Sequence, residues 1–101
     1  IEFNEMLRIQ DILEEVAFLS MDFDFHGKQE YSKQFIELYL KNMNEDIEEN
    51  LKLLEFYKSY RAYVRAKVYY SLALQDKTEV QKKNHKELAL AYMKLASSYE
   101  F

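Results

Sequence analysis

The chain of 101 residues is poor in the residue types that make tight turns and covalent crosslinks. It has one glycine and no proline, whereas average usage would give about seven and about five. All-β sandwiches and barrels need many such turn residues, so the composition argues against those folds. One glycine cannot build a glycine-rich phosphate loop or a dinucleotide-binding fingerprint. The absence of cysteine excludes disulfides, thiolate metal sites and a cysteine nucleophile.

Long hydrophobic runs and an excess of positive charge are also missing. No apolar stretch approaches the roughly 18 residues of a membrane span, and no secretory leader is recognisable. The 14 basic and 18 acidic residues give a net charge of −4, whereas nucleic-acid-binding domains usually have a basic excess. We therefore expect a cytoplasmic protein that binds neither nucleic acid nor a membrane.

Hydrophobic residues make up 49% of the chain and include nine tyrosines and seven phenylalanines, which is enough for one core. Their spacing predicts an all-α fold in a single helical domain over residues 1–101. We expect a four-helix bundle-like array with a long central third helix, and an irregular or extended segment at residues 1–10. The four helices are expected at about residues 11–26, 29–43, 46–74 and 79–98.

Helix-capping patterns set these boundaries. Gly27 stands where a left-handed residue closes the first helix. A capping box, in which an N-cap residue is followed three positions later by Glu or Gln, opens each of three helices. The three boxes are Asp11 with Glu14, Asp46 with Glu49, and Thr78 with Gln81.

The third helix is apolar on almost every side between residues 61 and 74. Such a helix is normally buried at the centre of a larger body. Three neighbouring helices of ordinary length could surround it, and so could a part of the protein that this chain lacks.

Lys58, Arg61 and Arg65 share one face of that helix, because they are spaced three and four residues apart. The face continues an apolar stripe, so each cation needs a counter-ion, a ligand or solvent. Three interpretations stay open. The cations pair with Glu15, Asp22 or Asp24 of the first helix, they line a cleft that binds an anion, or they are simply exposed.

Residue patterns that indicate catalysis or metal binding are weak. Asp22 and Asp24 point about 200° apart on a helix, so they cannot form one two-carboxylate site; we expect one to pair with an arginine and one to be solvated. His26, at a helix end, and His85, on a face expected to be solvated, lack metal-ligand spacing. No evident base accompanies the serines at positions 20, 32, 59 and 71, which leaves nucleophilic catalysis unsupported.

Two segments of the chain resemble the C-terminal lobe of aminoglycoside-phosphotransferase-like kinases. The first runs from Ile1-Glu2-Phe3-Asn4 through Leu7-Arg8, Asp11, Ala17-Phe18-Leu19 and Met21-Asp22 to Gly27. The second, more specific segment comprises Phe56-Tyr57-Lys58, Tyr60-Arg61-Ala62 and Val64-Arg65-Ala66-Lys67-Val68. The resemblance covers residues 1 to about 74, and it is closest to an uncharacterised branch of the family that is sometimes fused to an ATP-binding domain.

The resemblance implies that the chain is the helical remainder of the lobe, cut from a larger protein. The family's His-Gly-Asp-x-His catalytic loop and metal-binding aspartate would precede Ile1, so the chain alone is expected to lack phosphotransferase activity and to bind no cofactor. ATP and Mg²⁺ belong to the parent, if the parent is an active kinase. A mature product whose start has been removed is the other explanation of the non-methionine beginning.

The resemblance also assigns roles to single residues. Glu2 would lie beside the metal site, and Asp11 matches an aspartate that opens the helix after the metal loop. Glu15 stands where the family usually has an aspartate that braces the catalytic loop, and Asp22 belongs to the same supporting set. The basic residues match a helix that borders the substrate, where they would argue against an aminoglycoside if they faced the cleft: Lys58, Arg61 and Arg65.

The alternative to a kinase subdomain is a stand-alone helical module for protein interaction or dimerisation. Both interpretations predict an exposed apolar face, and therefore self-association into a homo-oligomer. The expected partner is either the missing remainder of the parent or a second copy of the chain.

Overall fold

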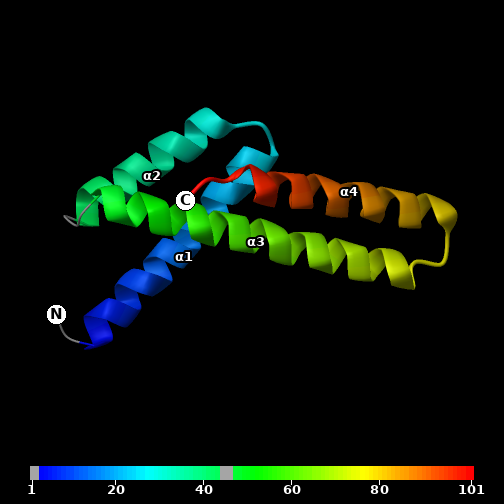
Figure 1. Ribbon diagram of the computed structural model, residues 1–101, viewed down its shortest axis with the longest axis horizontal. Coiled ribbons are helices and arrows are strands. Elements are labelled where there is room, and N and C mark those ends of the chain that lie inside the picture. The colour runs from blue at the N-terminus through cyan, green and yellow to red at the C-terminus, as the bar shows by residue number, and fades with distance from the viewer. Residues whose placement is uncertain (1–2, 44–46) are drawn as a thin grey trace.

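Residues 3–43 and 47–101 are described by the computed structural model, and within these ranges the chain forms four α-helices and no strand. Figure 1 shows their order along the chain, and the predicted all-α fold with a long third helix is confirmed. The helices are α1 (Phe3–Phe25), α2 (Gln29–Met43), α3 (Ile47–Gln75) and α4 (Glu79–Ser98).

Two of the predicted helix ends are built as the sequence indicates. Gly27 has a φ of +73°, its N–H donates to the carbonyl of Asp24 (3.0 Å), and the N–H of Lys28 donates to Phe23 (2.8 Å). This pair of bonds is the Schellman arrangement that closes α1. At the start of α4, Thr78 accepts a hydrogen bond from the N–H of Gln81 through its side chain (3.2 Å). The predicted cap at Asp46 lies outside the described residues.

The prediction for the N-terminal segment is wrong. Residues 3–10 are helical instead of irregular, and Asp11 with Glu14 lies inside α1 instead of capping it. Nothing between Phe3 and Asp11 breaks a helix, and the intervening residues include the strong helix formers Glu, Met, Leu, Arg and Gln. Their summed propensity outweighs one favourable N-cap residue, so the helix continues to Phe3.

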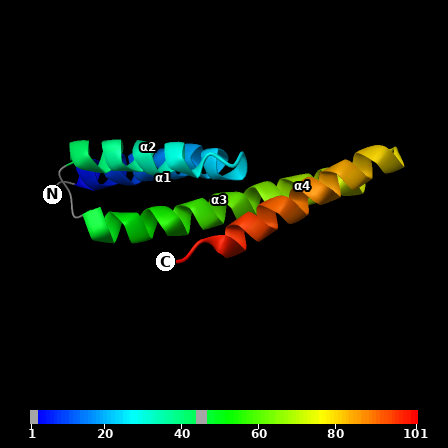
Figure 2. The ribbon, with the colours of Figure 1, turned by 90° about the horizontal axis from the view of Figure 1, so that it is seen from above.

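The helices form two layers, which Figure 2 shows edge-on. α1 and α2 make an antiparallel hairpin that covers the N-terminal part of α3, whereas α4 runs antiparallel along the C-terminal part of α3 (Figures 1 and 2). The α3–α4 hairpin therefore extends beyond the layer formed by α1 and α2, called the first layer below. The molecule is elongated as a result, with principal extents of 52 × 30 × 18 Å.

The buried apolar side chains fall into two clusters that both include α3. The first joins α1, α2 and the N-terminal part of α3 through Leu13, Val16, Ala17, Ile36, Leu40 and Leu54. The second joins α1, α3 and α4 through Met21, Ala62, Ala66, Tyr92 and Ala96. In the second cluster the ring of Tyr92 stacks on Phe25 at 3.8 Å and on Tyr69 at 5.6 Å.

Of the two ways in which the third helix was expected to be surrounded, the first, by three neighbouring helices of this chain, is wrong, and the second, by a part of the protein that this chain lacks, stays a prediction. Only part of the apolar surface of α3 is covered, because α4 and the α1–α2 layer contact it on adjoining sides. Tyr63, Tyr70 and Leu74 are 44%, 54% and 66% exposed. Apolar character all round a helix thus predicted burial that the four described helices do not supply.

Candidate functional site

The candidate site is the charged interface between α1 and α3, where most of the residues selected from the sequence meet. Lys58 lies in the interior, and its Nζ is 2.8 Å from Asp24 and 3.4 Å from Glu55. The side chains of Lys58 and Asp24 are only 6% and 9% exposed. A charge this deeply buried is tolerated because it is paired and hydrogen-bonded.

The C-terminal end of the chain completes this buried cluster. The hydroxyl of Tyr99 donates to Asp24 (2.6 Å), and the Tyr99 ring lies 4.8 Å below the ammonium of Lys58. Burial raises the pKa of the Tyr99 hydroxyl, and its hydrogen bond to Asp24 raises it further. The cluster of Asp24, Lys58 and Tyr99 therefore connects α1, α3 and the segment that follows α4.

Arg65, the last basic residue of the stripe, makes a more exposed pair. Nη2 of Arg65 is 3.7 Å from Asp22, and both side chains are about one-third exposed. The guanidinium also lies 5.0 Å from the ring centroid of Phe18 and 5.9 Å from that of Tyr92. Burial raises the pKa of the Tyr92 hydroxyl, and the positive charge of Arg65 offsets part of this increase.

Arg61 rests on an aromatic ring: its guanidinium carbon is 5.3 Å from the ring centroid of Phe18. Within the described part of the chain it forms no ion pair. Cation–π contacts of this kind contribute about 0.5–1 kcal/mol at exposed sites and more when they are desolvated. All three cations of the stripe thus turn toward α1 in the structure.

The two aspartates have separate partners, as their spacing on α1 predicts. Asp24 pairs with Lys58, and Asp22 pairs with Arg65. The expectation that one of them is solvated is wrong, because α3 supplies a cation opposite each. Asp11 and Glu15 are exposed on α1 and are not among the ion-pair partners of Lys58 and Arg65, and Glu2 lies outside the described residues.

The histidines also differ in environment. His26 is exposed beside Gly27, with its ring edge-on to Phe25. His85 is half-buried, contrary to the expectation of a solvated face, because its Nδ1 lies 2.5 Å from Asp76 in the loop before α4. Among the residues that the structure describes, no three His, Asp or Glu side chains are grouped so that they could hold a metal ion.

A groove of about 640 Å³ runs between α2 and α3 above this cluster. The wall and floor include Ile36, Leu40, Asp24 and Lys58. The floor also includes Ser32, whose buried hydroxyl is hydrogen-bonded to that of Ser20. Each buried polar side-chain atom of the described residues has a hydrogen-bond partner. The floor is therefore satisfied internally, and nothing in it calls for a ligand.

Sequence reasoning missed several members of the site. Tyr99 is 75 positions from Asp24 along the chain, and no local pattern links them. The sequence offers Ser20 and Ser32 only as possible nucleophiles, and no pattern in it links the two hydroxyls. Phe18 gives a usable signal, because it lies one helical turn before Asp22, so both side chains share the face of α1 that meets the basic stripe.

No known protein-family profile matches the chain, and no solved structure matches it. Uncharacterised proteins of Mycobacterium tuberculosis (two strains) and Mycobacterium bovis are each 37% identical to it over 68 residues. The match covers 67% of this chain but spans only 13% of the length of each relative. The chain is thus a small helical domain that resembles part of a larger uncharacterised mycobacterial protein. None of its four helices, as far as they are described, is long and apolar enough to cross a bilayer.

Proposed function

We propose that the chain is the helical part of the C-terminal lobe of an aminoglycoside-phosphotransferase-like kinase, and that it supports the lobe without supplying catalytic groups. One observation carries this proposal. The two segments with the resemblance lie on α1 and α3, and their side chains contact each other through Arg65 with Asp22 and through Phe18 with both arginines. The resemblance therefore rests on one contiguous unit.

The mycobacterial relatives support the view that the chain belongs to something larger. The matched residues make up 13% of each of those proteins, which leaves ample length for a nucleotide-binding lobe and a catalytic loop. In this proposal ATP and Mg²⁺ are bound by that remainder, which is also the principal partner of the chain. Asp11 and Glu15, exposed on α1, would face it, and Glu15 would brace the catalytic loop.

The basic stripe has a structural role in this proposal. Lys58 and Arg65 are paired with aspartates of α1, and Arg61 rests on Phe18. Their charges are engaged inside the unit, so they carry no information about the charge of the substrate. The parent's substrate class stays open, and an aminoglycoside is compatible with these contacts.

The first test is the reading frame that precedes Ile1. We expect a His-Gly-Asp-x-His motif within it and an aspartate immediately before Ile1; a frame without the motif would contradict the proposal. The second test is calorimetry with ATP and Mg²⁺. The parent protein should bind the nucleotide, whereas the 101-residue chain should give no heat of binding.

Variants of the parent separate a supporting role from a catalytic one. Arg65→Met should lower the melting temperature while kcat/KM per folded molecule stays within about twofold, because among the described residues Arg65 contacts Asp22 and Phe18 of α1 and Tyr92 of α4. Lys52→Met, on an exposed position of the same helix, is the matched control and should change neither quantity. A loss of kcat without a loss of stability in the Arg65 variant would refute the supporting role.

The exposed apolar side chains of α3 and α4 favour a second candidate, a stand-alone interaction module. Tyr70, Leu74 and Leu90 are 54%, 66% and 71% exposed. Large apolar side chains gathered on the surface of a soluble protein often mark a protein-interaction site. A natural start codon directly before residue 1 would favour this candidate over the kinase lobe.

A further inference from the structure

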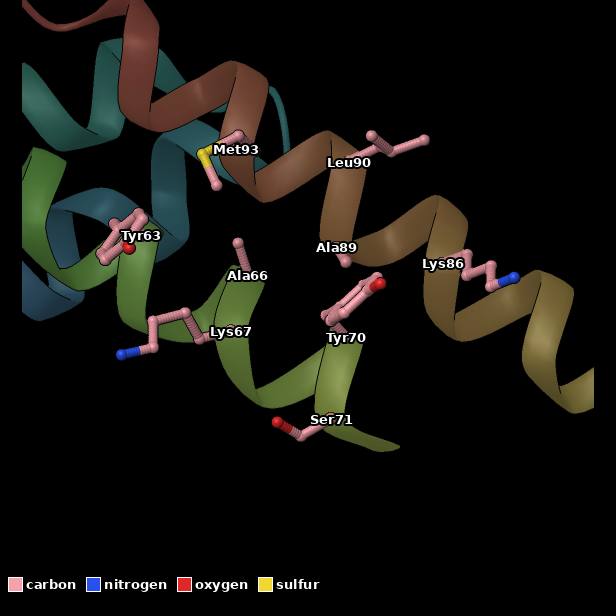
Figure 3. A pocket seen from close by; sticks show the side chains of 9 residues that line it. All are labelled: Tyr63, Ala66, Lys67, Tyr70, Ser71, Lys86, Ala89, Leu90 and Met93. Atoms are coloured by element: carbon pink, nitrogen blue, oxygen red, sulfur yellow. The ribbon is translucent and has the colours of Figure 1, made fainter. Parts of the chain in front are cut away.

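One face of the α3–α4 hairpin is hollowed into an apolar groove of about 520 Å³, shown in Figure 3. Ala66 and Ala89 form its floor and are 2% and 7% exposed. Tyr63 and Tyr70 of α3 form one wall, and side chains of α4 form the other, namely Leu90 and Met93. Small residues between two antiparallel helices leave room for a third helix to approach closely.

The groove is separate from the site described above. At 100° per residue, Tyr63 and Tyr70 lie on the side of α3 away from Arg61 and Arg65, which contact α1. The groove therefore lies outside the α1–α3 interface that carries the kinase-lobe proposal, and it gives the interaction-module candidate a specific binding surface.

The molecule exposes more surface than its mass requires. Its accessible area is 7543 Å², whereas a compact monomer of 12.3 kDa exposes about 6,100 Å². The excess of roughly 1,400 Å² is larger than the ~800 Å² that each partner buries in a standard interface. The α3–α4 hairpin, which projects beyond the first layer (Figure 2), accounts for the elongated shape.

Charge is distributed unevenly along the chain. Residues 61–98 carry eight basic and three acidic side chains, whereas residues 1–60 carry six basic and fourteen acidic ones. Residues 61–98, which make up most of the α3–α4 hairpin, are thus positive by five charges on a protein that is negative overall. Lys67 and Lys86 stand at the rim of the groove (Figure 3). Neither forms an ion pair with a carboxylate of the described residues, and Lys67 lies 5.6 Å over the ring of Tyr63.

We propose that this groove binds an acidic amphipathic helix. The apolar residues of such a helix, at i, i+3, i+4 and i+7, would contact Tyr70, Leu90 and the alanine floor. Its flanking carboxylates would pair with Lys67 and Lys86. This is helix-in-groove recognition, in which the apolar stripe supplies affinity and the rim charges select the partner.

The same charges disfavour a second copy of the chain as the occupant. Two hairpins packed groove to groove would bring the rim lysines Lys67 and Lys86 of both copies together, and like charges across an interface oppose binding. An arrangement in which the acidic half of one copy meets the hairpin of the next is heterologous, and it would build open-ended chains instead of a closed dimer.

The test is a fluorescence-anisotropy titration of the 101-residue chain with two labelled peptides. Both have leucine at i, i+3, i+4 and i+7; one has glutamate at the flanking positions and the other has lysine there. The acidic peptide should bind with micromolar affinity and the basic one at least tenfold more weakly. Raising the salt concentration from 50 to 500 mM should lower the affinity for the acidic peptide several-fold, because salt screens exposed charges.

Two pairs of variants locate the site. Lys67→Glu with Lys86→Glu should lower the affinity for the acidic peptide at least tenfold. The control makes the same charge change elsewhere, Lys33→Glu with Lys52→Glu, and its affinity for the acidic peptide should stay within threefold of wild type. Tyr70→Ala with Leu90→Ala should also weaken binding tenfold. The control for that pair is Leu38→Ala, an exposed leucine of α2, and should have no effect. Circular dichroism verifies that each variant is folded.

Several results would overturn the proposal. Equal affinity for the two peptides would remove the charge selection, and no binding of either would remove the site. Concentration-dependent self-association that Tyr70→Ala with Leu90→Ala abolishes would make a second copy the occupant. If a DNA duplex bound the chain and Lys67→Glu with Lys86→Glu weakened that binding as much as it weakens binding of the acidic peptide, the rim lysines would be assigned to nucleic acid.

Discussion

Replacing Lys58 by methionine should destabilise the protein strongly. Met keeps the length and apolar stem of the lysine but removes the ammonium group that lies 2.8 Å from Asp24 and 3.4 Å from Glu55. The Asp24 carboxylate, 9% exposed, then keeps only the Tyr99 hydroxyl as a side-chain partner. Removing one partner from a buried ion pair costs about 3–5 kcal/mol, because the other charge remains buried without compensation.

We expect the lower end of that range, about 3 kcal/mol, because the hydrogen bond from Tyr99 still stabilises the carboxylate. A domain of this size has a total free energy of unfolding of roughly 5–15 kcal/mol. The melting temperature should therefore fall by about 12–24 °C, at about 4–8 °C per kcal/mol.

The assay is urea unfolding followed by far-UV circular dichroism, with Lys52→Met of the same helix as the control, expected within about 0.5 kcal/mol of wild type. The double variant Asp24→Asn with Lys58→Met should recover at least half of the loss, because an amide needs no counter-ion. Two results would refute the reasoning. One is a loss of less than about 1 kcal/mol for Lys58→Met at an unchanged m-value. The other is a double variant whose loss of stability equals the sum of the losses of Asp24→Asn and Lys58→Met measured singly.

Three further predictions test other parts of the fold. Stability should fall as the pH rises above about 10, because burial raises the pKa of the Tyr92 and Tyr99 hydroxyls in the folded protein and the unfolded chain gives up these protons more readily. For Tyr99 the slope should approach about 1.4 kcal/mol per pH unit, and Tyr99→Phe should make the alkaline slope of a pH-dependent unfolding series shallower. Gly27→Ala should cost about 1–2 kcal/mol in thermal unfolding, since only the left-handed backbone opposes it and no atom lies within 4 Å of the added Cβ; Gly27→Asn should cost less, and equal losses would contradict a backbone cause. Ser20→Ala should cost about 1–3 kcal/mol by leaving the buried Ser32 hydroxyl without its partner, whereas Ser20→Ala with Ser32→Ala should be closer to wild type, and simple additivity in denaturant unfolding would argue against the pairing.

Local chemistry decided which parts of the fold could be predicted. The ends at Gly27 and Thr78 followed from backbone conformation and side-chain capping, which act over three or four residues. The start of α1 did not, because helix propensity summed over residues 3–10 competed with one N-cap residue and prevailed. A capping residue therefore predicted a helix end correctly only where the helix propensity of the neighbouring residues did not favour continuing the helix.

The candidate site was predictable in its composition but not in its connections. The sequence placed Lys58, Arg61 and Arg65 on one face and offered three destinations for their charges; the structure pairs Lys58 with Asp24 and Arg65 with Asp22. Which cation meets which anion depends on how α1 crosses α3. The hydrogen bond from Tyr99 to Asp24 joins the segment after α4 to the C-terminal end of α1, and only the complete fold brings these two segments together.

The continuity of α3 has a mechanical consequence. Its 29 residues contain neither glycine nor proline, so it is a rod of about 43 Å without a hinge. The N-terminal end of the rod packs against the α1–α2 layer, and its C-terminal end projects beyond that layer together with α4. A load applied at the loop between α3 and α4 would therefore act as a torque on the contacts around Lys58, and the rod would tilt as a whole before it bends.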